Sequence, residues 1–482
     1  MPEPTETPWQ MYLPEDRLKW TQTADPSPIW PFEPDVDIIR NIVQSSIPTE
    51  GDDPGDQIRC DFLADGAHHK IYNVTHPSWT TPYLFRVAIP VDPKLKLESE
   101  MATLQFLRQH TSIPVPRPIR WCSTRTVDNK LGYEWAILEK LPGVELRKVW
   151  RKVPWEKKLV LIENLAKFRT QIWDSSLKFS KIGSIYKISN DETREGVRIG
   201  PSVDGNFYAG RRRYLTSDRG PFSTCHEWLR AQIEIEREFL RTAKILANSR
   251  QSLGRTTSDA EWSDLMDEIG VDQDTLEEYD DVMSLCDIFL ELLPVLFPLP
   301  DQPTGNQDRF SLHHCDLREA NILVDPDTFN LTGIIDWEQT CTVPDWYGRD
   351  YPMMINTDEP FDAEEPSIPE TYDEEDERYN PAKVSNRDRW DSKLLREKFD
   401  AELVRLGWEG WHSSSRLDIV KSEFIQGVAD LKKDLKLVEA LPLANAVNQQ
   451  PIAGVNHINK LSISPREVGI LSENSSAKNS LP

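Results

Sequence analysis

The residues best suited to chemistry lie between positions 316 and 336. Asp316 is followed five residues later by Asn321, and Asp336 comes directly after the apolar pair Ile334-Ile335. Phosphoryl transfer requires a carboxylate that orients an acceptor hydroxyl and takes its proton, together with hard oxygen ligands for Mg²⁺. A loop that supplies Asp and Asn, followed by a second Asp, meets both requirements.

The chain between Asn321 and Asp336 predicts a hairpin. Residues 322–324 are an apolar strand, residues 325–331 turn the chain, and residues 332–335 return it. Asp336 is therefore expected to lie beside Asn321, although 15 residues separate the two.

Two other interpretations compete for these residues. A surface loop can carry acidic residues by chance, but the joint pattern of His-x-Asp-Leu, a later Asn, a turn and a second Asp is much rarer than a bare His-x-Asp. A metal-dependent hydrolase built from His313, His314, Asp316 and Asp336 is also conceivable. It gives neither Asn321 nor the hairpin a role, so phosphoryl transfer is favoured.

The segments that precede this motif predict a small sheet with one helix. Residues 58–74 have the pattern of strand, turn and strand, and residues 83–90 form a third apolar strand. Residues 97–110 carry apolar positions at helical spacing and are followed by several prolines. Two more strands are expected at 118–124 and 133–141.

After Pro142-Gly143 the pattern becomes helical, most clearly at 153–174, 227–247 and 284–297. We therefore expect an α+β fold with two lobes, a small antiparallel sheet with one helix and a larger, mainly helical lobe. The expected divisions are an N-terminal arm with a short helix (1–55), the small lobe (56–140), the large lobe with an acidic loop at 358–377 (141–445), and a disordered tail (446–482).

The motif HHCDLREANILVD…TGIIDWEQ closely resembles the catalytic and metal loops of aminoglycoside phosphotransferases and their choline-kinase relatives, a branch of the protein-kinase-like superfamily. The resemblance extends to SEMATLQFLRQHTSIPVPRPI and AILEKLPGVEL and covers roughly residues 58–350. It is greatest for divergent fungal members, which share the GPF and EWL elements at 220–222 and 227–229. Trp337-Glu338 in place of Phe-Gly is usual for small-molecule kinases of this branch.

The resemblance implies a bilobal protein-kinase-like fold with ATP in the cleft between the lobes. It makes Asp316 the catalytic base and assigns Mg²⁺ to Asn321 and Asp336. Glu100 becomes the helix carboxylate that braces the cation on the nucleotide phosphates. The hinge that meets adenine would run from Glu139 to Leu141.

The cation itself departs from the family pattern. Arg86 stands on the third strand, where a lysine is usual, and arginine differs from lysine in bulk and geometry. Lys70 on the second strand is the alternative. We expect Arg86 to pair with Glu100. The phosphate-covering loop LADGAHHK has one glycine, which leaves a pseudokinase-like nucleotide-binding or scaffold protein without turnover as the rival function.

Composition limits the partners. The net charge of -24 opposes binding to nucleic acid and anionic lipid, so neither nucleic acid nor membrane is expected as a partner. The six scattered cysteines and the lack of a signal-peptide pattern fit a cytoplasmic location. The expected activity is ATP- and Mg²⁺-dependent transfer of the γ-phosphate to a hydroxyl of a small molecule.

Overall fold

The structure is a computed structural model that describes residues 18–21, 27–49, 57–125, 129–188, 196–210, 212–252, 279–299, 309–347, 351–356, 381–408 and 416–431. The acidic loop expected at 358–377 and the tail expected from 446 onward lie outside the described residues, as does most of the N-terminal arm. Within the described residues, no helix is long and apolar enough to cross a membrane.

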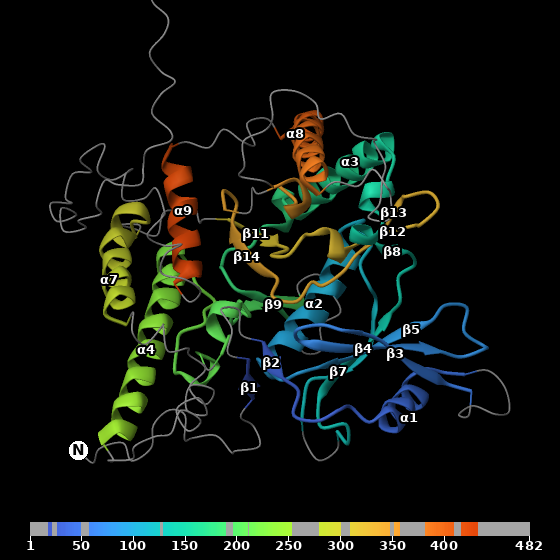
Figure 1. Ribbon diagram of the computed structural model, residues 1–482, viewed down its shortest axis with the longest axis horizontal. Coiled ribbons are helices and arrows are strands. Elements are labelled where there is room, and N and C mark those ends of the chain that lie inside the picture. The colour runs from blue at the N-terminus through green and yellow to red at the C-terminus, as the bar shows by residue number, and fades with distance from the viewer. Residues whose placement is uncertain are drawn as a thin grey trace, which may run out of the picture.

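A five-stranded antiparallel sheet forms the small lobe (Figure 1). Its strands lie in the order β3-β4-β5-β7-β6, which confirms the predicted order along the chain of three strands, a helix and two strands. The strands are β3 (Arg59–Asp65), β4 (His69–Thr75), β5 (Tyr83–Ala88), β6 (Pro118–Cys122) and β7 (Glu134–Glu139).

Helices cover both faces of this sheet. Helix α1 (Val36–Ser46) begins at Asp35, whose side chain accepts from the N–H groups of Asp37 and Ile38. It packs Ile39 and Val43 against Phe85 and Val87 of β5 in one apolar cluster. Helix α2 (Leu95–His110) shares a second cluster with Ala136 and Leu138 of β7. Strands β5 and β7 are therefore buried on both sides, which explains their mostly apolar sequences, whereas β4 buries only every second residue.

The large lobe is mainly helical and has two groups of helices (Figure 1). One group packs α3 (Trp155–Ile172) against α8 (Pro381–Arg405). The other contains α4 (Cys225–Ser252), α7 (Tyr279–Leu296) and α9 (Arg416–Asp430), which share one apolar core. The helices predicted at 153–174, 227–247 and 284–297 are confirmed, the last with five further residues at its start.

Short strands and turns connect the larger elements. The β12–β13 hairpin has Ile322 opposite Ile334 and confirms the predicted hairpin. The strands are β1 (Lys19–Trp20), β2 (Pro28–Ile29), β8 (Val144–Glu145), β9 (Ser184–Lys187), β10 (Val197–Gly200), β11 (Phe310–His313), β12 (Ile322–Val324), β13 (Leu331–Ile334) and β14 (Cys341–Pro344). The 3₁₀ turns are η3 (Leu146–Lys148), η4 (Trp150–Lys152), η5 (Ser175–Leu177), η7 (Gly205–Phe207), η8 (Arg212–Tyr214), η9 (Glu319–Asn321) and η10 (Met353–Ile355).

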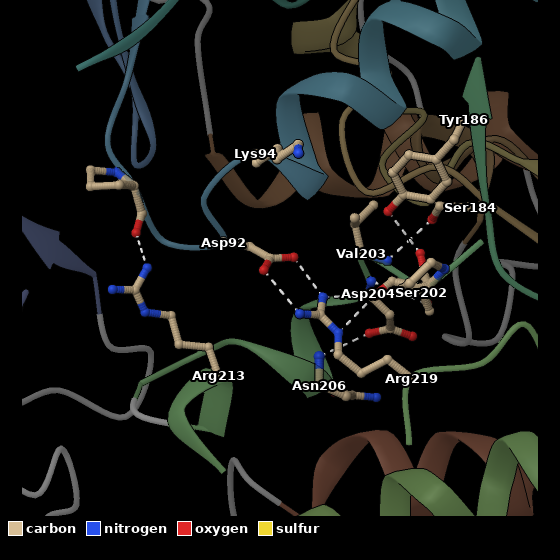
Figure 2. Close-up of polar contacts among 12 residues, drawn as sticks. Asp92, Lys94, Ser184, Tyr186, Ser202, Val203, Asp204, Asn206, Arg213 and Arg219 are labelled. Atoms are coloured by element: carbon tan, nitrogen blue, oxygen red, sulfur yellow. Dashed lines mark hydrogen bonds and ion pairs between the residues drawn. The ribbon is translucent and has the colours of Figure 1, made fainter. Parts of the chain in front are cut away.

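A segment of the large lobe also holds the loop between β5 and α2. Arg219 makes a two-point ion pair with Asp92 of that loop, with Nη1 2.9 Å from Oδ1 and Nη2 2.5 Å from Oδ2 (Figure 2). Arg213 donates to the carbonyl of Pro90. Tyr208 packs with Ile89 and Val91 in a small apolar cluster. The contacts of Arg219, Arg213 and Tyr208 with this loop thus join the two lobes. The chain that follows β7 is the second connection.

Candidate active site

The loop after β11 holds Asp316 in a defined position. The Asn321 side chain donates from Nδ2 to Asp316 Oδ2 and to the Asp316 carbonyl oxygen, both at 2.9 Å. Arg318 Nε lies 2.9 Å from the same Oδ2. Asn321 is buried, whereas the Asp316 side chain is one-third exposed. This arrangement fixes one carboxylate oxygen and leaves the carboxylate accessible to a substrate.

His314 ties this loop to the end of the hairpin. Its Nδ1 accepts from the Asp316 N–H at 3.2 Å, and its Nε2 donates to the Ile335 carbonyl at 3.1 Å. These partners indicate a neutral ring protonated on Nε2. Burial lowers the pKa of His314 to about 4, consistent with that state. His314 therefore positions Asp316 and is not placed as a metal ligand, contrary to the hydrolase alternative.

The hairpin brings Asp336 to Asn321. The Ile335 N–H donates to the Asn321 carbonyl at 2.9 Å, so the next residue, Asp336, lies beside it. Asp336 has a left-handed backbone conformation with φ of 65°. The hairpin therefore brings together Asn321 and Asp336, which are 15 residues apart in the sequence, as predicted.

Asp336 is a carboxylate in an unfavourable environment. Burial raises its pKa to about 7, and the nearby carboxylates of Glu338 and Glu100 act in the same direction. Arg86 and Lys96 oppose this shift but do not cancel it. A divalent cation would relieve this cost, since it favours the charged form of its ligand.

The oxygen atoms of Asn321 and Asp336 fit Mg²⁺. Asn321 uses Nδ2 for Asp316, which leaves Oδ1 as the atom that could bind a metal. In the part of the chain that the structure describes, no group of three or more His, Cys, Asp and Glu side chains could hold a metal ion. Mg²⁺ is commonly bound by one or two protein oxygens, with water and phosphate completing its shell, so a two-residue site suits it.

Arg86 and Glu100 form the predicted ion pair. Nη1 of Arg86 on β5 lies 2.7 Å from Oε1 of Glu100 on α2, and Nη2 contacts Oε2. Both side chains are buried. Although burial opposes the charge, Glu100, Glu338 and Asp336 raise the pKa of Arg86 above its ordinary value.

Lys70 lies on the other face of the sheet. Ile71 is opposite Arg86 in the β4–β5 register, so the side chain of Lys70 points away from the Arg86 face. Its Nζ lies 2.5 Å from Oε2 of Glu33 and 5.1 Å from the centre of the Trp30 ring. Ile71 shares the cleft face with Arg86, so its neighbour Lys70 faces the opposite side of the sheet. The geometry therefore does not support Lys70 as the phosphate-binding cation.

The expected hinge residues occupy the end of β7 and the turn after it. The Glu139 N–H donates to the Arg117 carbonyl, and its carboxylate lies 3.4 Å from Arg108 Nη1. Leu141 packs against β13, where a Cβ at Gly333 would lie 2.6 Å from Leu141 Cδ1. The glycine thus lets the hinge approach the hairpin that carries Asp336.

Four further side chains at this site were not predicted. The Glu338 carboxylate contacts Lys96 Nζ and lies 3.2 Å from His68 Nδ1 and from His69 Nε2. Burial works to raise the pKa of Glu338, yet Lys96, His69 and His68 hold it well below its usual range. Lys96 was missed because the helix was expected to begin at Leu97, whereas it begins two residues earlier, at Leu95. The sequence feature that could have indicated this cluster was the adjacent pair His68-His69 in LADGAHHK.

The chain belongs to the phosphotransferase enzyme family, whose model matches residues 59–176 and 212–398. With the two lobes described above, this membership confirms the predicted α+β, bilobal, protein-kinase-like fold and the resemblance to aminoglycoside phosphotransferases and choline kinases.

Named relatives are similar at a low level of identity. A subtelomeric hrmA-associated cluster protein of Aspergillus fumigatus is 24% identical over 381 residues, which cover 74% of this chain and 71% of that protein. Altered inheritance of mitochondria protein 9 of Candida tropicalis is 23% identical over 413 residues, covering 77% of this chain and 61% of that protein. Among solved structures, an aminoglycoside-3'-phosphotransferase of type VIII has a TM-score of 0.37 at 15% identity, covering 82% of this chain and 98% of that one.

Proposed function

We propose that the protein transfers the γ-phosphoryl group of ATP, with Mg²⁺, to a hydroxyl group of a small molecule. The observation that carries this proposal is the convergence of three oxygen-bearing side chains. Asn321 donates to Asp316, and the Asn321 carbonyl accepts from the residue before Asp336. One residue, Asn321, thus connects a carboxylate suited to a base, through its side chain, with one suited to a metal, through its backbone carbonyl.

Each residue has a distinct task in this proposal. Asp316 accepts the proton of the acceptor hydroxyl, while Asn321 and Arg318 hold the carboxylate in position. Asn321 Oδ1 and Asp336 would hold Mg²⁺, which would neutralise charge on the phosphates. Arg86, braced by Glu100, binds phosphate oxygens with the N–H groups that its two-point pair with Glu100 leaves free. ATP supplies the phosphoryl group.

The net charge of the chain bears on its partners. The net charge of -24 disfavours nucleic acid and anionic membranes as partners. We also propose a cytoplasmic location. Microscopy of the full chain with a C-terminal fluorescent tag tests it, and a signal confined to mitochondria, the compartment in the name of the Candida tropicalis relative, would contradict it.

A second candidate is a nucleotide-binding or scaffold protein without turnover. Two observations favour it. Arginine replaces the usual lysine at position 86, and the ammonium group of Lys96 is already paired with the carboxylate of Glu338. Against it stand the intact Asp316, Asn321 and Asp336 and their mutual contacts.

An ATP-depletion screen against a library of hydroxylated metabolites separates the two candidates. The kinase proposal expects at least one compound that accelerates ATP consumption by wild type but not by Asp316→Asn. Binding of MgATP with no accelerated consumption in any well would support the scaffold. Equal consumption by wild type and Asp316→Asn would show that the assignment of the base is wrong.

A further inference from the structure

A cluster of four side chains from three segments lies beside the metal-binding residues proposed above. Glu338 follows the β12–β13 hairpin, Lys96 belongs to the first turn of α2, and His68 and His69 come from the turn and strand after β3. All four are largely buried, with exposed fractions of 7% for Lys96, 11% for Glu338, 17% for His68 and 12% for His69. The proposed reaction gives none of them a task.

The cluster has the composition of an anion site that is already filled. Lys96 Nζ contacts one carboxylate oxygen of Glu338, and His69 Nε2 lies 3.2 Å from that same atom. His68 Nδ1 lies 3.2 Å from the other oxygen. Carboxylate and phosphate oxygens are both anionic acceptors of charge-assisted hydrogen bonds from such donors. Phosphate oxygens could therefore replace Glu338 without any new donor.

The position of the cluster specifies the ligand. Glu338 lies two residues beyond Asp336, and Arg86 interacts electrostatically with both carboxylates. Arg86 is already paired with Glu100, whereas the partner of Lys96 is a side chain on the irregular segment after the hairpin. Movement of Glu338 therefore requires less rearrangement than movement of Glu100, which is fixed on α2.

We propose that Lys96, His68 and His69 form a phosphate-binding subsite for the polyphosphate chain of the nucleotide, and that Glu338 fills this subsite as an internal competitor until the phosphates displace it. This inference rests on the proposed function, since it places the nucleotide phosphates beside Asp336. The free energy that Glu338 gains from the subsite is subtracted from the apparent affinity for the ligand.

The test measures the binding of inorganic tripolyphosphate, ATP and adenosine by titration calorimetry. Glu338→Gln keeps the shape of the side chain but removes its charge, so it should bind tripolyphosphate and ATP about tenfold or more tightly than wild type. Lys96→Met should bind both about tenfold or more weakly. Adenosine lacks phosphates, and its affinity should stay the same in every variant.

A more exposed Lys–Glu ion pair elsewhere supplies the control. Lys398 Nζ lies 2.6 Å from Glu163 Oε1 between α8 and α3, away from the cluster. Lys398→Met and Glu163→Gln make the same chemical changes and should leave all three affinities unchanged. The double variant Lys96→Met/Glu338→Gln removes both charges without leaving either unpaired. It should lose the gain that Glu338→Gln shows alone, because that gain requires Lys96.

Three results would overturn the inference. The first is an unchanged or weaker affinity of Glu338→Gln for tripolyphosphate. The second is an unchanged affinity of folded Lys96→Met for the same ligand. The third is a gain in affinity in the double variant equal to that of Glu338→Gln. The proposed function fails separately. If no variant binds ATP more tightly than tripolyphosphate and none binds adenosine, the site does not take a nucleotide. A tripolyphosphate gain in Glu338→Gln that depends on Lys96 would then still support the subsite.

Discussion

The guanidinium of Arg86 and the carboxylate of Glu100 form a two-point ion pair between β5 and α2, with Nη1 and Oε1 2.7 Å apart. Only 9% of the Arg86 side chain and 3% of the Glu100 side chain are exposed. A lysine could make one such contact but not two parallel ones. The arginine therefore fixes α2 to the sheet while its charge still interacts with the carboxylates of Asp336 and Glu338.

Arg86→Ala is expected to weaken both folding and nucleotide binding. Glu100 would remain as a buried charge without its partner, a change that typically costs about 3–5 kcal/mol. Arg86→Lys keeps the charge and should lose less in both measurements, which are chemical denaturation and ATP titration. Lys70→Ala is the control and should leave ATP affinity unchanged, because Lys70 faces away from the cleft. Loss of ATP binding in Lys70→Ala, with none in Arg86→Lys, would assign the cation role to Lys70.

The Asp92–Arg219 pair is expected to contribute strongly to stability (Figure 2). Asp92 is 5% exposed and Arg219 is 16% exposed, so the pair is largely shielded from solvent. Arg219→Ala should lower the free energy of unfolding by about 3 kcal/mol. Arg147→Ala removes an arginine that is 62% exposed and paired with Glu145, and it should cost less than about 1 kcal/mol. Equal losses in the two variants would mean that the Asp92–Arg219 pair contributes no more to stability than an exposed ion pair.

Glu134 gives stability a pH dependence. Burial raises its pKa from 4.5 to about 7, so the folded chain retains a proton that the unfolded chain releases. Stability from this group is therefore present below pH 4.5 and is lost as pH rises to about 7. Glu134→Gln keeps an acceptor for the Lys94 N–H and should become the more stable protein across this window, by about 3 kcal/mol at its upper end. Denaturation curves at several pH values check this. A difference from wild type that does not change with pH would contradict it.

Local pattern explains which parts of the site could be predicted. The hairpin from Asn321 to Asp336 is encoded in neighbouring residues as two apolar runs and a turn, so the hairpin and the proximity of its two ends could be predicted. The Arg86–Glu100 pair joins a strand to the next helix, only 14 residues on. Both features depend on elements that are adjacent in the chain.

Long-range contacts could not be predicted in the same way. Lys96 and Glu338 are 242 residues apart, and Asp92 and Arg219 are 127 apart. Neither pair has a periodic signal, because the partners meet only after separate lobes have packed. The β9–β10 hairpin lies in a polar stretch without clear alternation, and the family model also leaves residues 177–211 unmatched.

Asp316→Asn is expected to separate turnover from binding. The amide keeps the shape of the side chain and the oxygen that Asn321 and Arg318 contact, but it cannot accept the proton. Turnover on an acceptor found by screening should fall by about 10²–10⁴-fold, while MgATP affinity stays close to that of wild type. Single-turnover transfer of labelled phosphate, together with calorimetry, measures both quantities. A parallel loss of MgATP affinity would assign Asp316 to the nucleotide site instead.

The most direct test of the account is the Mg²⁺ dependence of ATP affinity in wild type and in Asp336→Ala, because it requires no knowledge of the acceptor. We predict that Mg²⁺ tightens ATP binding by wild type about tenfold or more, since the ion bridges the phosphates and the two ligands are coupled. In Asp336→Ala the affinity should be the same with Mg²⁺ and with a chelator. Wild-type affinity that ignores Mg²⁺, or a full Mg²⁺ effect in Asp336→Ala, would contradict the assignment of this cleft as a MgATP site.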